Sequence, residues 1–249
     1  MCTLELTWLR KNSSDLSTNG GYSTPFFTEF NTRLWDFIIN VLANQRTDGS
    51  KIVDIVYDLT DGEFLISYTI SLEVSTDGGA NFQALTYGCT GDIGANRDSG
   101  SKSIFWDLNL QYDDKYFRDA KVRVKATFLD RTSTNETLLF TIDTRDPEIT
   151  ILYPNGGEHF SDYDISMVEI GWTAYDETGH GELVIAAYIS FELGGWYVPI
   201  ETEMENMGYA HLDLSADGSV PDRLWGKLKM IATDSYGNQG IDYSNNFFI

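Results

Sequence analysis

Cysteine is nearly absent from this sequence of 249 residues, which contains only Cys2 and Cys89. One lies at the extreme N-terminus and the other in a predicted loop, so no disulfide framework is expected and stability must come from burial of apolar side chains. Cys2 would suit lipid attachment after removal of a leader, but no apolar segment precedes it. We interpret both residues as ordinary free thiols.

Basic residues are also scarce. The chain has 17 Lys and Arg against 38 Asp and Glu, a formal net charge of −21 and a pI near 4.2. Such a surface repels nucleic acid and anionic bilayers. No apolar run approaches the roughly 20 residues of a membrane helix. Nucleic-acid partners and membrane insertion are therefore excluded, and the acidity is typical of a secreted or surface protein that also offers carboxylates to calcium.

Catalytic signatures are missing as well. The three histidines, His159, His180 and His211, do not have the spacing of metal ligands. No G-x-S-x-G elbow, P-loop or G-x-G-x-x-G turn occurs, and a glycosidase carboxylate pair cannot be selected among so many acids. We predict that the protein is not an enzyme.

The first 16 residues lack the basic start and apolar stretch of a signal peptide. If Met1 is the native start, this favours a virion protein assembled in the host cytoplasm, and if it is a cloning start, a cell-surface protein is favoured. In the second case the end at Ile249, where a further Asp-Thr-Arg segment would begin, has the appearance of a cut between repeats. Both locations are extracellular in the mature assembly, and the sequence leaves them open.

Strand signals, in contrast, occur throughout the chain. Hydrophobic residues make up 42% and aromatic residues 14%, which is ample for two packed cores. Alternating segments rich in β-branched and aromatic residues are separated by Gly, Asp, Asn and Ser clusters. The predicted strands include Lys51–Leu59, Ile66–Val74, Lys121–Phe128, Val168–Tyr175 and Lys227–Thr233. One apolar segment, Arg33–Leu42, fits a helix or a buried strand equally well.

An internal repeat organises these strands into two units. Phe-Asn-Thr-Arg at 30–33 returns as Ile-Asp-Thr-Arg at 142–145, and the chain end at 247–249 matches 140–142. We predict an all-β protein of two tandem immunoglobulin-like sandwiches at 34–145 and 146–249, preceded by an N-terminal extension at 1–33. Trp106 and Trp172 are expected to lie in the two cores.

Several motifs carry a family resemblance. Asn44–Leu59 (NQRTDGSKIVDIVYDL), Ser71–Phe82 (SLEVSTDGGANF), Gly91–Gly94 (GDIG) and Ser103–Leu108 (SIFWDL) resemble repeat modules of large bacterial, metagenomic and phage-borne surface proteins. Ile149–Phe160 (ITILYPNGGEHF) is similar to the PNGGE domains that precede immunoglobulin-like repeats. The ending ATDSYGNQG resembles the close of many bacterial immunoglobulin-like modules. The resemblance covers most of residues 40–249 and implies scaffolding, spacing and adhesion, but no reaction.

Calcium is the candidate cofactor, because hard oxygen ligands are concentrated in turns. The candidate ligands are Asp58, Asp61, Asp143, Asp146 and Glu148, which we expect at one pole of the molecule. The alternative is that these acids only cap turns and keep Pro147 in an exposed hinge.

Trp196 and Tyr197 follow a Gly-Gly turn, whose tip would expose rings for stacking on a glycan or a protein partner. Core packing of one ring is the alternative. These features leave three hypotheses: a structural spacer, decoration or fibre module, an adhesin or carbohydrate-binding module, and an accessory domain of a larger enzyme. Residues 1–9 have the pattern of an edge strand that would add to a neighbouring subunit.

Overall fold

A computed structural model describes residues 37–60, 67–161, 167–179, 181–191, 195–214 and 225–248. Within these ranges the regular structure is β-sheet, apart from the short 3₁₀ helix η1 (Leu108–Leu110) and a 3₁₀ residue at Met167. The predicted extension at 1–33 and the predicted edge strand at 1–9 lie outside the described residues. The prediction of an all-β fold is confirmed, and in the described ranges no helix is long and apolar enough to cross a membrane.

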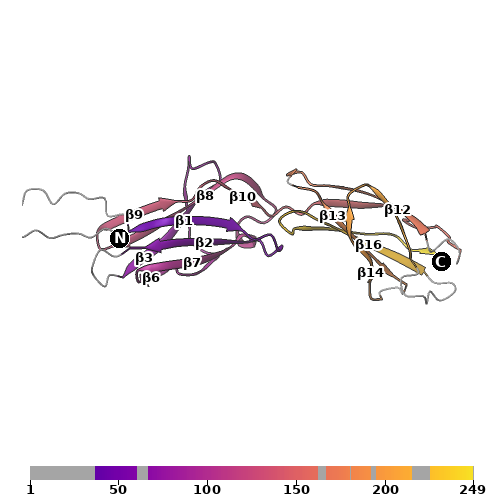
Figure 1. Ribbon diagram of the computed structural model, residues 1–249, viewed down its shortest axis with the longest axis horizontal. Helices are drawn as coiled ribbons and strands as arrows, with labels where there is room; N and C mark the ends of the chain where they lie inside the picture. Colours follow the sequence, from indigo (N-terminus) through magenta and orange to yellow (C-terminus); the bar gives the residue numbers. More distant parts are fainter. Residues whose placement is uncertain are drawn as a thin grey trace, which may run out of the picture. The chain divides into compact units, whose positions relative to one another are not determined.

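The first sandwich contains two antiparallel sheets (Figure 1). One sheet has the order β1-β2-β7-β5, and the other has the order β10-β8-β3-β4, with β9 added to β8 and β6 added to β3. The strands are β1 (Ile38–Gln45), β2 (Ile52–Leu59), β3 (Tyr68–Ser75), β4 (Gln83–Leu85), β5 (Cys89–Gly91), β6 (Gly94–Arg97), β7 (Gly100–Asp107), β8 (Tyr116–Phe128), β9 (Arg131–Glu136) and β10 (Phe140–Asp143).

The second sandwich also contains two antiparallel sheets. Their orders are β11-β12-β15 and β14-β13-β16-β17, with β18 added to β16. The strands are β11 (Glu148–Tyr153), β12 (Val168–Tyr175), β13 (Val184–Ser190), β14 (Val198–Glu205), β15 (Tyr209–Leu212), β16 (Trp225–Thr233), β17 (Gln239–Tyr243) and β18 (Phe247–Phe248).

The two sandwiches share one topology. The pairs β1–β2, β2–β7, β3–β4, β3–β8 and β8–β9 in the first correspond to β11–β12, β12–β15, β13–β14, β13–β16 and β16–β17 in the second. In both, the chain crosses between the sheets after the second strand, as in immunoglobulin-like sandwiches. Phe140 pairs with Ala120 and Phe247 pairs with Gly226. The final strand therefore occupies the same place in each unit, as the repeat in the sequence indicated.

Each sandwich has its own hydrophobic core, and the two cores share no residue. Trp106 is fully buried in the first core and Trp172 is 2% exposed in the second, as predicted. The indole N–H of Trp172 donates a hydrogen bond to Asn206 Oδ1 at 3.0 Å. Burial of these rings supplies much of the stability of a chain whose described cysteine, Cys89, is a free thiol.

Two strand predictions show how the alternation works. In β8, Val122, Val124 and Ala126 are buried while Arg123 and Lys125 lie on the half-exposed face, as the sequence pattern predicts. The apolar segment Arg33–Leu42, which fitted a helix or a buried strand equally well, is a strand in the part that the structure describes. Residues 38–45 form strand β1.

The Asp-Gly-Gly turn after β3 is stabilised by one carboxylate. Asp77 accepts hydrogen bonds from the Ser75 hydroxyl at 2.6 Å and from the backbone and side-chain N–H groups of Asn81 at 2.9 and 2.7 Å. These bonds, that of Ser75 first, lower the pKa of Asp77 to about 2. Gly78 and Gly79 have φ angles of 77° and 96°, so they serve the turn as predicted.

Candidate functional site

Three segments far apart in the sequence meet where the two sandwiches join. They are the turn between β1 and β2 (residues 46–51), the linker after β10 (residues 144–147) and the turn between β16 and β17 (residues 234–238). Resemblance motifs lie in each turn, since Gln-Arg-Thr-Asp-Gly-Ser spans 45–50 and Asp-Ser-Tyr-Gly-Asn spans 234–238. We call this region the junction.

The backbone of Asp143, the last residue of β10 before the linker, is hydrogen-bonded by side chains from both sandwiches. The Asp143 N–H donates to Gln45 Oε1 at 2.8 Å, and Gln45 Nε2 donates to the Asp143 carbonyl. Asn238 Nδ2 donates to the same carbonyl at 3.1 Å. Gln45 and Asn238 are each 2% exposed, so these bonds are shielded from competing water. The Asp143 carbonyl thus accepts hydrogen bonds from both sandwiches.

The two turns also touch directly. The Gly49 N–H donates to the Tyr236 carbonyl at 3.1 Å. A Cβ atom on Gly237 would lie 2.3 Å from Gly49 N, and a Cβ atom on Gly49 would lie 2.5 Å from Gly237 O. Both glycines have positive φ, 75° for Gly49 and 81° for Gly237. Glycine is therefore required at both positions for the backbone conformation and for the close approach.

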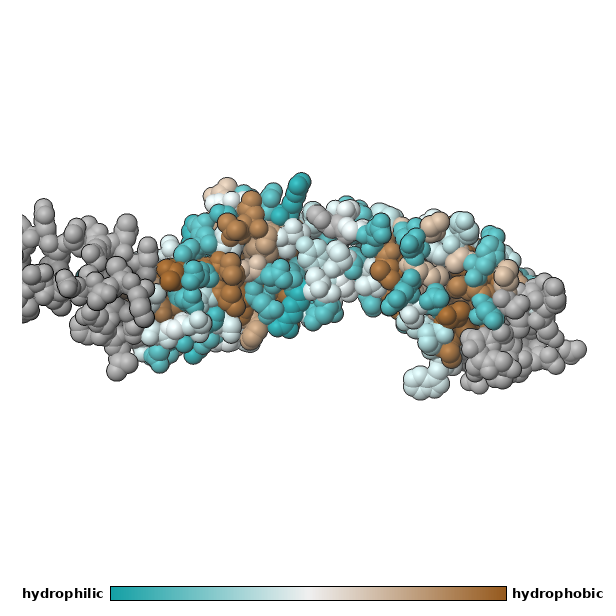
Figure 2. Space-filling model, in the orientation of Figure 1, coloured by the Kyte–Doolittle hydropathy of each residue, from teal (hydrophilic) through white to brown (hydrophobic). Residues whose placement is uncertain are grey.

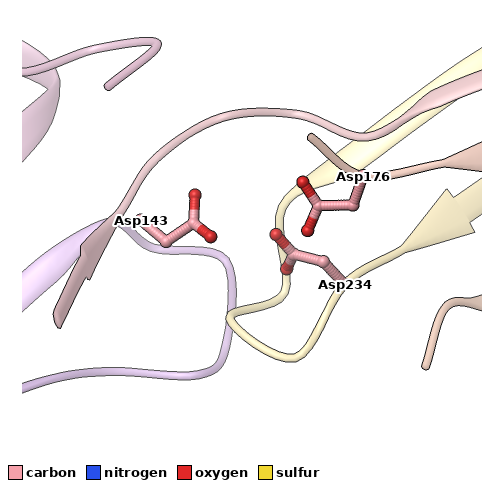
Figure 3. A group of neighbouring side chains, drawn as sticks. All are labelled: Asp143, Asp176 and Asp234. Carbon is pink, nitrogen blue, oxygen red and sulfur yellow. The ribbon is translucent and has the colours of Figure 1, made fainter. Parts of the chain in front are cut away.

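A group of three aspartates lies at the centre of the junction, and we call it the aspartate cluster. It consists of Asp143 at the end of β10, Asp176 directly after β12 and Asp234 directly after β16. One carboxylate oxygen from each lies within 4.8 Å of the others. Figure 3 shows the three carboxylate groups directed toward one another from three separate segments.

The turns position two of these carboxylates. Asp176 accepts hydrogen bonds from the backbone N–H of Thr178 at 2.9 Å and from its hydroxyl at 2.6 Å. Asp234 accepts from the backbone N–H groups of Tyr236 and Asn238, both at 2.8 Å, and from Asn238 Nδ2 at 2.8 Å. Aspartate at the start of a turn commonly makes such bonds, which fix its side chain.

Asp143 differs from its two neighbours because it is fully buried. Its Oδ1 accepts the Arg145 N–H at 3.1 Å, but its Oδ2 has no hydrogen-bond partner. Burial raises the pKa of Asp143, the adjacent Thr178 hydroxyl and the Arg145 backbone N–H lower it, and the charges of Asp234 and Asp176 raise it again, with a net increase. Asn238 Oδ1, next to Asp234 in the same turn, is likewise buried without a partner.

Cations near the aspartate cluster are paired with other acids. Lys51 forms ion pairs with Asp113 at 3.2 Å and Asp146 at 3.3 Å, and Arg145 pairs with Glu177 at 2.5 Å. Over the ranges that the structure describes, no lysine or arginine forms an ion pair with a member of the cluster. Among the described residues, the carboxylates of the cluster are therefore held by hydrogen bonds and not by basic side chains.

An acidic pocket of about 250 Å³ opens beside the cluster. It is lined by Asp176 together with Asp114, Arg145, Asp146, Glu148, Tyr175 and Glu177. Two of the acids that the sequence suggested as calcium ligands, Asp146 and Glu148, thus lie at the entrance of the cluster rather than in it. A third, Asp143, belongs to the cluster itself.

The other two suggested ligands are not part of this group. Asp58 lies near the end of β2, about 20 Å from the start of that strand at Ile52 for an extended chain. There it accepts hydrogen bonds from Asn40 Nδ2 at 2.7 Å and from the Ser101 hydroxyl at 2.6 Å. The structure does not bring Asp58 to the junction, and Asp61 lies outside the described residues.

Trp196 and Tyr197, the suggested ligand-binding aromatic residues, have different environments. Trp196 is 93% exposed, whereas Tyr197 is half-buried and packs on Tyr243 with ring centroids 5.7 Å apart. Lys227 Nζ lies 5.5 Å from the centroid of the Tyr243 ring. Trp196 is therefore the solvent-facing one of the two suggested aromatic residues.

The described residues offer little for covalent chemistry. Cys89 lies in a hollow of about 500 Å³ in the first sandwich, where burial raises its pKa to about 11. Its thiol stays protonated at neutral pH and is a weak nucleophile. His159 packs on Phe248 and His211 lies 3.7 Å from Glu169. His180 lies outside the described residues.

Asp176 and Asp234 were not among the residues that the sequence suggested. Their signal is present in the motifs Ala-Tyr-Asp at 174–176 and Ala-Thr-Asp at 232–234, each of which ends a strand with an aspartate. Glu148 pairs with Tyr175, and Val184 pairs with Thr233. Both aspartates therefore follow strand ends on the side of the second sandwich where the linker enters.

No protein-family model and no curated protein matches the chain. Among solved structures, it is similar to a tetra-tandem repeat from the extending region of a large adhesion protein, with 16% identity, a TM-score of 0.30 and coverage of 83% of this chain and 48% of that one. It is also similar to domains FN1–FN3 of chicken CNTN1, with 16% identity, a TM-score of 0.32 and coverage of 85% and 64%. The chain thus spans less than two thirds of either protein. Neither similarity assigns an activity or a ligand to this chain.

Proposed function

We propose that the chain is a non-catalytic structural module, a spacer, decoration or fibre component that stands on the surface of a cell or a virion among protein partners. The observation that carries this proposal is the junction. Buried hydrogen bonds from Gln45 and Asn238 and the contact between Gly49 and Gly237 hold two sandwiches of the same topology together. A joint of this kind fixes the position of one sandwich relative to the next, as a spacer requires.

Surface composition supports the same proposal. The net charge of −21 opposes non-specific association, and in the view of Figure 2 hydrophobic residues form small areas separated by hydrophilic ones. The sequence motifs of the first unit also resemble repeat modules of surface proteins. We infer an extracellular location from these features.

Immunogold labelling tests the location. Antibodies raised against the full chain are expected to label the outside of intact cells or virions of the source, with gold particles beyond the envelope or capsid. Antibodies against a cytoplasmic protein of the same source provide the control, which should label only permeabilised cells. If the antibodies against this chain also labelled cells only after permeabilisation, the proposed location would be contradicted.

A second candidate function, carbohydrate binding, is favoured by the exposure of Trp196. The indole ring is 93% exposed and therefore accessible to a partner, and a flat aromatic face stacks on the apolar face of a sugar. Tyr197, the next residue along the chain, packs on Tyr243 and is a second candidate for such a contact. In this alternative the module is an adhesin.

If Trp196 binds glycans, Trp196→Ala should weaken binding to a responsive glycan on an array by about 10-fold or more, as expected for an aromatic contact that dominates an interface. Tyr87→Ala is the matched control, because Tyr87 is also an exposed aromatic residue, at 56%, but belongs to the first sandwich. Equal binding by the wild type and Trp196→Ala, or no binding to any glycan, would count against the adhesin function.

A further inference from the structure

We propose that the aspartate cluster binds one calcium ion, which joins the two sandwiches through Asp143, Asp176 and Asp234. Asp143 is contributed by the last strand of the first sandwich, and the other two come from turns of the second. The ion would therefore act as a bridge at the junction. This inference does not depend on where the protein is located, so it can fail while the surface role stands.

Geometry is the first argument for the site. The three carboxylate oxygens lie within 4.8 Å of one another, and ligands on opposite sides of a calcium ion are separated by about 4.6–5.2 Å at Ca–O distances of about 2.3–2.6 Å. Asp176 and Asp234 are fixed by hydrogen bonds within their turns. The cluster thus has the dimensions of a cation site before any ligand is added.

The unpartnered oxygen of Asp143 is the second argument. Asp143 is fully buried, and its Oδ2 has no hydrogen-bond donor although Figure 3 shows the carboxylate directed at the other two. A buried polar atom is nearly always satisfied, and an isolated buried carboxylate is expensive. A cation between the three groups satisfies Oδ2 and removes the repulsion among the charges.

The ligand chemistry favours calcium over other metals. All three groups offer hard oxygen atoms, and the partner-free Asn238 Oδ1 lies in the turn that supplies Asp234. Neither a described histidine nor Cys89 belongs to the cluster, so its chemistry differs from that of zinc sites. Magnesium demands regular octahedral geometry and keeps several waters, which suits a buried carboxylate site less well. Asp176 also lines the acidic pocket, which is open to solvent on that side of the cluster.

Thermal unfolding of the full chain with EDTA or with added calcium chloride tests the site. When free calcium is about 100 times its dissociation constant, the Tm of the wild type is expected to rise by about 10 °C. Asp143→Asn removes one charge while keeping the size of the side chain. In EDTA this variant should melt a few degrees above the wild type, because repulsion is reduced, and calcium should shift its Tm by less than about 2 °C.

Asp58→Asn is the matched control, since Asp58 is also a hydrogen-bonded aspartate near a strand end but lies away from the junction. It should keep the full calcium response, and Asp176→Asn should lose it as Asp143→Asn does. A wild-type Tm that does not move with millimolar calcium would overturn the proposal. An undiminished response in both cluster variants would place the ion elsewhere, and an equal shift with magnesium would reject calcium as the occupant.

Discussion

Replacement of Trp172 by alanine is expected to lower the free energy of unfolding of the second sandwich by about 3–5 kcal/mol. The ring is 2% exposed and belongs to the core between the two sheets, so its removal loses buried area and leaves a cavity. It also leaves Asn206 Oδ1 without the indole donor that now lies at 3.0 Å. Denaturant unfolding followed by circular dichroism measures the change.

Two further variants make this experiment decisive. Trp196→Ala removes the same side chain at a site that is 93% exposed, and the free energy of unfolding should change by less than about 0.5 kcal/mol. Trp172→Phe keeps most of the volume but not the N–H group, so a loss of about 1–2 kcal/mol is expected. If Trp172→Ala cost no more than Trp196→Ala, the assignment of Trp172 to the core would be wrong.

Most of the fold could be predicted from the sequence, because apolar and polar residues alternate with a period of two in strands that have one buried and one solvent-exposed face. Val122, Val124 and Ala126 alternate with basic residues, and the structure buries the apolar set. The segment at 33–42 could not be assigned, since it is apolar at nearly every position and has no clear period. Its described part is strand β1, which pairs with β2, a contact that only the tertiary structure reveals.

The candidate site was predictable only in part, for a physical reason. Asp143 was suggested from the linker, but its neighbours Asp176 and Asp234 are 33 and 91 residues further along the chain, and the three residues end or follow strands of three different sheets. Asp58 was expected at the same pole as an acid of the segment Tyr-Asp-Leu-Thr-Asp-Gly-Glu, and it also ends the motif Val-Tyr-Asp. In the repeat, however, that motif corresponds to Ala-Tyr-Asp at 174–176, so Asp58 is the counterpart of Asp176 in the first sandwich.

That correspondence explains why an acid predicted for the junction lies elsewhere. Residues at the same place in two tandem units are separated by a whole unit, and Asp58 lies at the end of β2 that is remote from the turn containing Gly49. The first-unit counterpart of the linker is Asn-Thr-Arg at 31–33, which lies outside the described residues. A tandem repeat in the sequence therefore predicts which residues are equivalent in the two units. Which residues lie close together at the junction depends on how the two sandwiches pack.

Replacement of Gly237 by alanine is expected to open the junction while both sandwiches remain folded. The added Cβ atom would lie 2.3 Å from Gly49 N and 2.8 Å from the carbonyl carbon of Asp48, and these are backbone atoms that cannot rotate away. Alanine at a φ of 81° adds a backbone cost of about 1–2 kcal/mol within the turn. Trypsin cleavage after Arg145 in the linker, followed by mass spectrometry, should become at least 10-fold faster, which corresponds to about 1.4 kcal/mol of lost protection.

The control separates the steric effect from the backbone effect. Gly157 also lies in the second sandwich with a φ of 88°, but a Cβ atom there would meet nothing within 4 Å. Gly157→Ala should therefore have a similar backbone cost without accelerating cleavage after Arg145. If Gly237→Ala were cleaved at the wild-type rate, the contact between the two turns would not restrain the linker, and the buried bonds from Gln45 and Asn238 to Asp143 would have to hold the junction by themselves.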